Sequence, residues 1–321
     1  MTELPETDSA GAVHGHTSVL IDELLHLTQP RPGECLLDCT AGRGGHAAAI
    51  AERLGTTGGV LLLDRDQVNL EYARARVAST GVGVVQAQQR DFRWVEAAAA
   101  SFTRPANLLI ADLGFSSNQV EDGQRGLSFR TEGPLDMRLD PSGSTTAEEL
   151  VNELPETELA QIIWELGEEP LARRIAQRII RERQVGPIRT TTQLALIVLR
   201  AYGSRAESSR VHPATRTFQA IRIAVNDELG ALEGLLQVVE RASAVVGRGE
   251  ASQLLTPGAR IGIISFHSLE DRLVKRAFAR MMRAGLAREP ERGPICASED
   301  EVEKNPRSRS AKLRVVALVG R

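Results

Sequence analysis

The sequence is poor in cysteine and in aromatic residues, and it contains no long hydrophobic run. Its 321 residues include three cysteines, Cys35, Cys39 and Cys296, and 3% of its residues are aromatic. Three cysteines cannot all pair and none belongs to a CxxC motif, so the sequence indicates neither a disulfide framework nor a zinc site. No run of roughly 18 apolar residues occurs, and residues 1–15 are acidic rather than basic and apolar. We therefore expect a cytoplasmic protein without a membrane segment.

The chain also lacks an excess of positive charge. Its 39 Lys and Arg residues face 42 Asp and Glu residues, a net charge of -3, which is unusual for a protein that coats nucleic acid nonspecifically. A nucleic-acid surface must then be local, and the candidates near the C-terminus are Lys304, Arg307, Arg309, Lys312 and Arg314. The alternative is a solvated tail of mixed charge. The carboxylates form no evident ligand cluster, so the sequence points to no metal site and leaves metal dependence open.

The first third of the chain alternates short apolar segments with helical patterns. Four of these segments are expected strands, at residues 34–40, 60–63, 83–86 and 107–111. Such alternation is typical of a parallel sheet covered by helices, so we predict an α/β fold. With 42% hydrophobic residues, the chain can also bury the core of a second domain.

A region with a different hydrophobic pattern follows the fourth expected strand. Residues 144–199 carry amphipathic helical patterns without a convincing strand, and strand patterns return at 260–266 and 313–319. This order predicts an all-helical domain inserted into the sheet domain. We place the first part of the sheet domain at residues 1–115, the helical insertion, expected to recognise the substrate, at 116–211, and the second part at 212–321.

A glycine-rich turn follows the first expected strand and indicates a nucleotide-like ligand. Gly42, Gly44 and Gly45 permit a tight turn and a close approach of the backbone, ahead of a helix whose amides can face the ligand. Asp64, 22 residues after Gly42, ends the second strand, where a carboxylate can accept both ribose hydroxyls. A purely structural turn remains the alternative. NAD also remains open as the ligand, because Ala47 stands where some NAD sites accept alanine.

Further candidates lie beyond other strand ends. Asp112 closes the fourth strand, where ligands of open α/β sheets bind, although it could instead cap a helix. Phe92 could stack on an adenine ring or belong to the core. Ser265 and His267 follow the later strand, and the nearby acidic residues could simply begin a helix. No GxSxG motif occurs, which disfavours a serine hydrolase.

The quoted segments resemble those of the bacterial small-subunit ribosomal RNA cytosine-N4 methyltransferase family. The resemblance runs from His16 to Arg314, nearly the whole chain. The motifs that carry it are HTSVLIDELL at 16–25, GRGGH at 42–46, the strand-end Asp64, DLGFSSNQ at 112–119, RGLSF at 125–129, GPLDMRLD at 133–140, HPATRTFQAIRIAVNDEL at 212–229, SFHSLEDR at 265–272 and NPRSRSAKLR at 305–314. So many long motifs in one order are highly specific.

The resemblance implies a Rossmann-like class I methyltransferase sheet with an inserted helical domain, and S-adenosyl-L-methionine as the cofactor. The cofactor contacts that it implies are Gly44, Gly45, His46, Asp64, Phe92, Asp112 and Gln119, to which the turn adds Gly42. Four residues depart from the family pattern, namely Ala47, Phe115, Asn118 and Leu127. These changes lie around the expected cleft, so they affect fine substrate geometry more than the reaction.

The implied reaction requires help from the protein, because the lone pair of cytosine N4 is delocalised into the ring. We hypothesise that Asp112, or a carbonyl of Leu113 or Gly114, accepts a hydrogen bond from N4, with His267 and Ser265 on the opposite wall. The group that removes the proton stays open. Expected substrate contacts are the ring of Phe115, with Phe129 and Phe266 as further candidates, and the cations Arg125, Arg130, Arg138, Arg216, Arg307 and Arg309.

The predicted function is S-adenosyl-L-methionine-dependent methylation of a cytosine N4 amine in the decoding region of 16S ribosomal RNA. The RNA partner would be met within the small ribosomal subunit, and a homodimer stays open. Two alternatives remain, an NAD-dependent oxidoreductase and a noncatalytic RNA-binding ribosome assembly factor.

Overall fold

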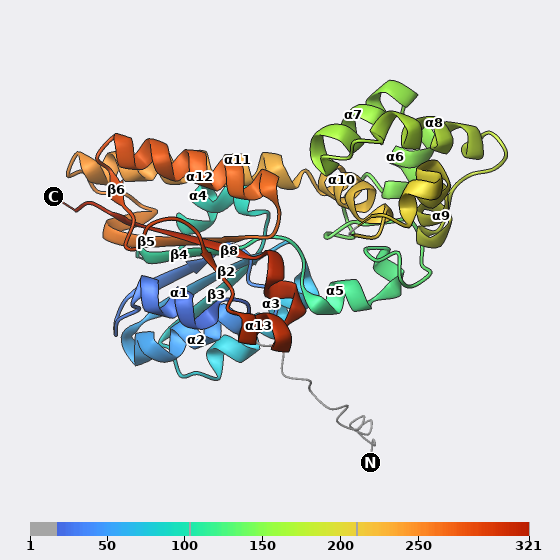
Figure 1. Cartoon of the computed structure of the whole chain (residues 1–321). Coiled ribbons are helices and arrows are strands. Elements are labelled where there is room, and N and C mark those ends of the chain that lie inside the picture. Colours follow the sequence, from blue (N-terminus) through green and yellow to red (C-terminus); the bar gives the residue numbers. More distant parts are fainter. Residues whose placement is uncertain (1–17, 103, 210, 321) are drawn as a thin grey trace, which may run out of the picture.

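The computed structural model describes residues 18–320 except 103 and 210, and it has two parts, a helix-covered sheet and a helical unit (Figure 1). His16 and Thr17, which begin the first motif of the resemblance, lie outside the described residues, as do the acidic residues of the N-terminal segment. In the described part of the chain, no helix is long and apolar enough to cross a membrane.

One sheet organises the first part, in the strand order β3-β2-β1-β4-β5-β8-β6, with β7 paired to β8. The strands from β3 to β5 are parallel, whereas β8 is antiparallel to its neighbours. Their bounds are β1 Cys35–Asp38, β2 Gly59–Asp64, β3 Val84–Gln89, β4 Ala106–Asp112, β5 Leu255–Ser265, β6 Ala287–Arg288, β7 Ile295–Cys296 and β8 Lys312–Leu318. The α/β prediction is confirmed, with an antiparallel edge that the sequence patterns did not reveal.

The order of the strands indicates where on the sheet a ligand would bind. After β3 the chain returns to add β4 on the other side of β1, so the crevice between β1 and β4 is the switch point of the sheet. In open α/β sheets, ligands bind beyond the carboxyl ends of the strands at such a point. The side chains at these ends are Asp38, Asp64 and Asp112.

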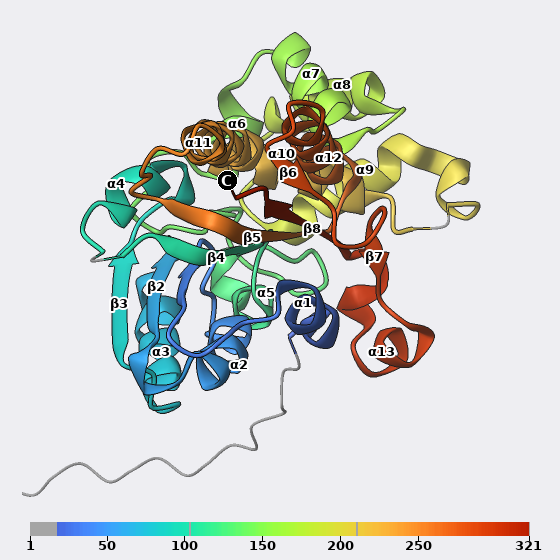
Figure 2. The same ribbon diagram turned by 90° about the vertical axis from the view of Figure 1, so that its left-hand side faces the viewer.

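Helices cover both faces of the sheet, which explains why the inner strands are apolar almost without interruption. All four residues of β1 are buried, as are five of the six residues of β2. Figures 1 and 2 show α11 and α12 over one face and α2 and α3 over the other. The helices around the sheet are α1 Ile21–Thr28, α2 Gly45–Leu54, α3 Gln67–Ala78, α4 Val95–Ala99, α11 Glu228–Gly247, α12 Ser268–Arg283 and α13 Glu299–Lys304, with short 3-10 helices η1 Gly55–Thr57, η2 Phe92–Trp94 and η5 Pro306–Ser310.

The helical unit has a hydrophobic core of its own, built from buried residues between Leu135 and Ile221. Its helices are α6 Ala147–Glu153, α7 Glu156–Gly167, α8 Ala172–Arg183, α9 Thr191–Tyr202 and α10 Ala214–Asn226, and η4 Gly203–Ala206 follows α9. Capping boxes at Thr146 and Thr190 begin α6 and α9. Because α10 packs in this core, the helical unit extends past the boundary placed at 211.

The polar segment after β4 joins the two parts. It contains α5 Ser117–Glu121 and η3 Gly123–Arg125, and it then runs on to the helical unit (Figure 1). The helical unit therefore begins where the chain leaves the carboxyl edge of the sheet. Since α10 leads directly into α11, the chain also returns from the helical unit next to the same edge.

Candidate active site

A cavity of about 550 Å³ lies beyond the carboxyl ends of β1, β2 and β4. Residues of the sheet domain line one side of it, and Leu127, Phe129, Leu139, Phe218 and Gln219 belong to the connecting segment and the helical unit. A cavity of this size is typical of a small-molecule site, and here apolar side chains and many polar or charged side chains line it together. Both parts of the chain are needed to form it.

The glycine turn after β1 forms one wall. The amide of Gly42 donates a hydrogen bond of 2.7 Å to Oδ2 of Asp64, so the turn and the end of β2 are joined directly. Gly42 and Gly45 line the cavity, and a Cβ atom at Gly45 would lie 2.0 Å from the hydroxyl of Ser18. At Gly45 the space that a Cβ would need is taken by Ser18, whereas Gly42 leaves the backbone of the turn open on the cavity side.

Gly44 has a different position from the one expected. It is the left-handed residue that precedes α2, with a φ of 73°, and it does not line the cavity. A Cβ atom there would lie 2.9 Å from Cα of Ala73 on α3. The requirement for glycine at 44 thus comes from the close packing of α2 against α3, whereas we had expected a cofactor contact.

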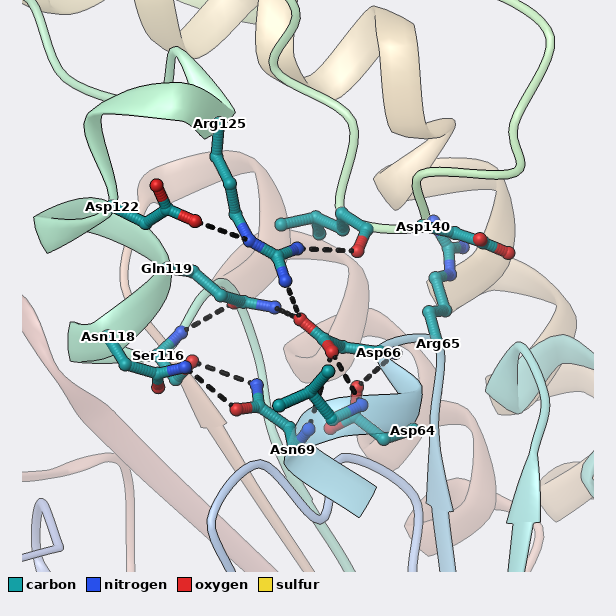
Figure 3. Close-up of polar contacts among 12 residues, drawn as sticks. Asp64, Arg65, Asp66, Asn69, Ser116, Asn118, Gln119, Asp122, Arg125 and Asp140 are labelled. Atoms are coloured by element: carbon teal, nitrogen blue, oxygen red, sulfur yellow. Dashed lines mark hydrogen bonds and ion pairs between the residues drawn. The ribbon is translucent and has the colours of Figure 1, made fainter. Parts of the chain in front are cut away.

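Asp64 and Asp66 organise the turn after β2 (Figure 3). Oδ1 of Asp64 accepts a hydrogen bond of 2.8 Å from the amide of Asp66, and burial raises the pKa of Asp64 to about 6. Asp66 caps α3 by accepting from the amides of Val68 and Asn69. Each oxygen of Asp64 keeps a second lone pair, so its carboxylate can still accept from the hydroxyls of a ribose.

Asp112 ends β4 inside the cavity, as the sequence predicts. One carboxyl oxygen, Oδ2, lies 3.6 Å from Nδ1 of His46, and the other, Oδ1, is buried without a hydrogen-bond partner in the described part of the chain. Burial, together with the negative charge of Glu270, raises the pKa of Asp112 to about 7. An unsatisfied buried oxygen beside a cavity favours a ligand that donates a hydrogen bond or carries positive charge.

Sequence reasoning missed Asp38, which ends the strand between those of Asp64 and Asp112. It is buried, it accepts a hydrogen bond of 3.0 Å from the amide of Thr40, and burial raises its pKa to about 7. The same signal that singled out Asp64 and Asp112, a carboxylate at the end of an apolar strand, was available here. Asp38 does not line the cavity, and its hydrogen bond to Thr40 holds the chain just before the glycine turn.

His46 contributes a neutral ring to the site. Its Nε2 lies 2.8 Å from the carbonyl oxygen of Val19, and a carbonyl can only accept, so the proton is on Nε2. Burial lowers the pKa of His46, which favours the uncharged form. The contact between His46 and Asp112 is therefore not an ion pair at neutral pH.

His267 and Glu270 form the wall beyond β5. His267 precedes α12 in a capping box with Glu270, and its Nε2 lies 3.2 Å from a carboxyl oxygen of Glu270. Burial opposes ionisation of Glu270, but the neighbouring His267 ring and the hydrogen bond from the amide of Phe266 outweigh it and lower the pKa of Glu270. Glu270 thus also has the helix-capping role that was the alternative interpretation of this motif.

Ser265 does not face the cavity, which contradicts its predicted place on the wall. It is buried, and its hydroxyl donates a hydrogen bond of 3.4 Å to the carbonyl of Lys312 in β8. Side chains alternate between the two faces of a strand, and the strand motif alone did not determine which face Ser265 occupies. His267, which does line the cavity, stands beyond the end of β5.

The structure also brings together a group that the sequence did not reveal. Glu228, His267 and Glu270 each place one potential metal-ligand atom within 4.8 Å of the others. Arg222 already pairs with Glu228 through two hydrogen bonds of 2.7 and 2.9 Å. All three residues line the cavity, where Arg222 compensates the charge of Glu228 and the start of α12 binds Glu270.

Phe92 and Gln119, two predicted cofactor contacts, line the cavity. Phe92 is partly buried and packs against the core beside α11, so it serves the core and the cavity at once. Gln119 is buried, and its amide nitrogen donates a hydrogen bond of 3.0 Å to Oδ2 of Asp66. Gln119 therefore holds the turn after β2 in addition to facing the cavity.

The predicted substrate contacts divide into two groups. Phe115 and Arg307 line the cavity, and the guanidinium carbon of Arg222 lies 4.6 Å from the centre of the Phe115 ring. Arg309 is exposed and lies outside the cavity wall. Three residues that depart from the family pattern, Phe115, Asn118 and Leu127, line the cavity, and Asn118 also donates a hydrogen bond to Asn69 of α3. The fourth, Ala47, is fully buried in the core.

Arg138 and Arg216, which we expect to contact RNA phosphate, also make hydrogen bonds within the protein. Arg138 makes hydrogen bonds of 2.6 and 2.9 Å to the carboxylate of Asp136. Arg216 donates to the carbonyl of Glu168 just after α7, and Gln219 donates to Leu166 in the same turn. Arg216 and Gln219 lie three residues apart on α10, and both donate to carbonyls at the end of α7.

Comparison with known proteins identifies relatives over nearly the whole chain. A family profile described as the MraW methylase family matches residues 13–319. Ribosomal RNA small subunit methyltransferase H of Heliobacterium modesticaldum is 40% identical over 326 residues, covering 96% of this chain and 99% of the relative. The protein of the same name from a Synechococcus species is 44% identical, covering 98% and 95%. Among solved structures, a methyltransferase homolog protein from Pyrococcus horikoshii covers 93% of this chain and 65% of that one, at 11% identity and a TM-score of 0.40, which is too low to carry an argument.

Proposed function

Because the chain belongs to the MraW methylase family, we propose that it methylates the N4 amine of a cytosine in the decoding region of 16S ribosomal RNA, with S-adenosyl-L-methionine as the methyl donor. The observation that carries the proposal is the unsatisfied Oδ1 of Asp112 beside the glycine turn, within one cavity. Membership of this family sets aside the NAD-dependent oxidoreductase.

The residues of the cavity fit the proposed cofactor. S-adenosyl-L-methionine supplies a methyl group bound to a positively charged sulfur, which makes that methyl group open to attack by an amine. We assign the ribose to Asp64, the face of the adenine to Phe92, and the close backbone approach to Gly42 and Gly45. The carboxylate of Asp112 lies on the cavity wall nearest to β4, where negative charge favours a cationic ligand.

Asp112 has the properties that the N4 amine requires of a partner. When ionised, its free oxygen accepts a hydrogen bond from N4–H, which orients the nitrogen and stabilises the positive charge that develops on it. Since the pKa of Asp112 is raised to about 7, the carboxylate can also take up the proton that N4 releases. We therefore assign both roles to Asp112, and we give His267 and Glu270 the opposite wall.

The RNA would enter from the side of the helical unit. The target base has to leave its stack to reach the cavity, and the exposed ring of Phe115 offers a surface for it. Arg307 at the cavity and Arg309 on the neighbouring surface are the cations assigned to phosphate. The substrate places the reaction in the cytoplasm, in the context of the small ribosomal subunit.

The decisive experiment combines purified protein, S-adenosyl-L-methionine labelled in its methyl group, and small ribosomal subunits that lack the modification. We expect label in 16S RNA and a single modified cytosine on mapping. Asp112→Asn is the matched control, because it keeps the shape of the side chain but loses its charge. Label in another base, or binding of the protein to the subunit without methyl transfer, would contradict the proposal, and the second result would favour the noncatalytic assembly factor.

A further inference from the structure

Each of the three residues in the turn from Asp64 to Asp66 forms hydrogen bonds with a different part of the chain. Asp64 accepts from the amide of Gly42 in the glycine turn, at 2.7 Å. Arg65 donates a hydrogen bond of 2.6 Å to the carbonyl of Asn226 at the end of α10. Asp66 bonds to the segment that follows β4. The turn proposed to hold the ribose is thus in direct contact with the helical unit.

Asp66 is the most heavily bonded residue of this turn (Figure 3). Its side chain is buried, and Oδ1 caps α3. Oδ2 accepts from the amide nitrogen of Gln119 at 3.0 Å and pairs with Nη2 of Arg125 at 2.6 Å. A carboxylate with bonds to α3, α5 and η3 cannot move without loss of several hydrogen bonds at once.

Arg125 extends this contact to the cavity wall on the side of the helical unit. Its Nη1 donates a hydrogen bond of 3.2 Å to the carbonyl of Leu139, and its own carbonyl accepts from the amide of Met137 at 3.0 Å. Asn226 holds the same short segment, since it donates to the carbonyl of Met137 and accepts from the amide of Leu139. Leu139 lines the cavity, so Arg125 links the turn proposed to hold the ribose to the cavity wall formed by the segment around Leu139.

We propose that Arg125 is a positioning residue that couples the two ligands, so that bound cofactor strengthens RNA binding and bound RNA strengthens cofactor binding. The inference rests on the proposed function. Both ligands would contact walls from the sheet domain and from the segment around Leu139, so each stabilises the assembled cavity. Because binding free energies are linked, the coupling must be the same in both directions.

The experiment measures the Kd for small ribosomal subunits with and without saturating S-adenosylhomocysteine, a product that permits no turnover. For the unmodified protein we expect S-adenosylhomocysteine to lower the Kd by about fivefold or more, within the usual range of coupling between sites. The coupling ratio is the Kd for small subunits without S-adenosylhomocysteine divided by the Kd with it. In Arg125→Gln this ratio should fall to about one, because the link between Asp66 and Leu139 is lost. The Kd for S-adenosylhomocysteine alone should change by less than about threefold, since Asp64 and Gly42 remain.

Two further variants separate coupling from a general loss of structure. Arg248→Gln removes an arginine from an exposed pair with Glu250 after α11, and it should keep the full ratio. Asp66→Asn keeps the oxygen that caps α3 but weakens the pair with Arg125, so it should lower the coupling ratio. The double variant Asp66→Asn, Arg125→Gln should have about the same coupling ratio as Arg125→Gln alone, because both changes break the same pair.

The outcomes distinguish this inference from the proposed function. Equal Kd values with and without S-adenosylhomocysteine in the unmodified protein overturn the coupling, even if no variant folds. A full ratio in Arg125→Gln overturns the role of Arg125. Failure of the unmodified protein to bind S-adenosylhomocysteine, or to bind small subunits, contradicts the proposed function instead.

Discussion

Nδ1 of His46 lies 3.6 Å from Oδ2 of Asp112, and the two residues come from α2 and from the end of β4. The other ring nitrogen of His46 is bound to the carbonyl of Val19, and burial lowers the pKa of the ring. With its proton on Nε2, the neutral ring has no hydrogen on Nδ1 to donate to Asp112, so His46 does not neutralise the Asp112 carboxylate. The negative charge of Asp112 stays available to the cavity, which is the property that the proposed chemistry uses.

Replacement of Asp112 by asparagine should depress turnover while cofactor binding is largely kept. The amide cannot take up a proton from N4, and the loss of a positioned base typically lowers a rate by about 10²- to 10⁴-fold. Single-turnover methylation of small subunits and calorimetric titration with S-adenosylhomocysteine measure the two effects. Asp300→Asn, on the exposed first turn of α13, is the control. Normal turnover in Asp112→Asn removes this residue from the mechanism.

The rate of methyl transfer should rise with pH through about 7, because the raised pKa of Asp112 leaves its carboxyl protonated below that value. The same shift has a consequence for stability. A raised carboxyl pKa contributes stability that is present below the unfolded pKa and is lost as the pH rises through the folded pKa. The melting temperature of Asp112→Asn relative to the unmodified protein should therefore increase between pH 5 and pH 8. A pH-independent difference, or a rate that falls as the pH rises through 7, contradicts the assignment.

Substitution of Asp64 by alanine should weaken S-adenosylhomocysteine binding by about 10- to 100-fold, the range expected for lost hydrogen bonds to a charged group. The substitution also removes the acceptor for the amide of Gly42, so the glycine turn loses its link to β2. Titration calorimetry measures the affinity. Glu71→Ala on the exposed side of α3 should bind normally. An unchanged affinity in Asp64→Ala would show that the ribose lies elsewhere.

Arg307→Gln should weaken binding to small ribosomal subunits and reduce the salt dependence of that binding. Each phosphate contact to a single strand contributes about 0.7 to the slope of log K against log salt, so the slope should flatten by about that amount. Arg309→Gln tests the neighbouring cation in the same way, and Arg292→Gln, in an exposed turn between β6 and β7, is the control. Unchanged slopes in both test variants would remove these two residues from the RNA surface.

Gly44→Ala should destabilise the fold by about 1–3 kcal/mol, because the added Cβ meets α3 and the backbone is left-handed. Gly186→Ala provides a matched control, since a Cβ at 186 has no neighbour within 4 Å among the described residues. That control should be neutral or slightly stabilising. Chemical denaturation measures both changes, and equal stability of the two variants would contradict the packing argument.

Local patterns predicted much of this protein. Apolar segments located β1, β2 and β4 within a few residues, and the carboxylates that end two of them placed Asp64 and Asp112 at one edge of the sheet. Glycine spacing identified the turn that lines the cavity at Gly42 and Gly45. These features are readable because burial repeats with the period of each element, and because parallel strands end together at one edge. Family membership, confirmed by the comparisons, supplied the reaction.

Other features depend on contacts between distant residues. Sequence patterns did not reveal that Arg138 and Arg216 bind within the protein, that Ser265 turns away from the cavity, or that α10 packs in the helical core. The link from Asp66 to Arg125, across 59 positions, has no local signature either. A pattern along the chain defines which face of an element is apolar, but the packing of whole elements decides which polar groups meet there, and only the tertiary structure fixes that packing.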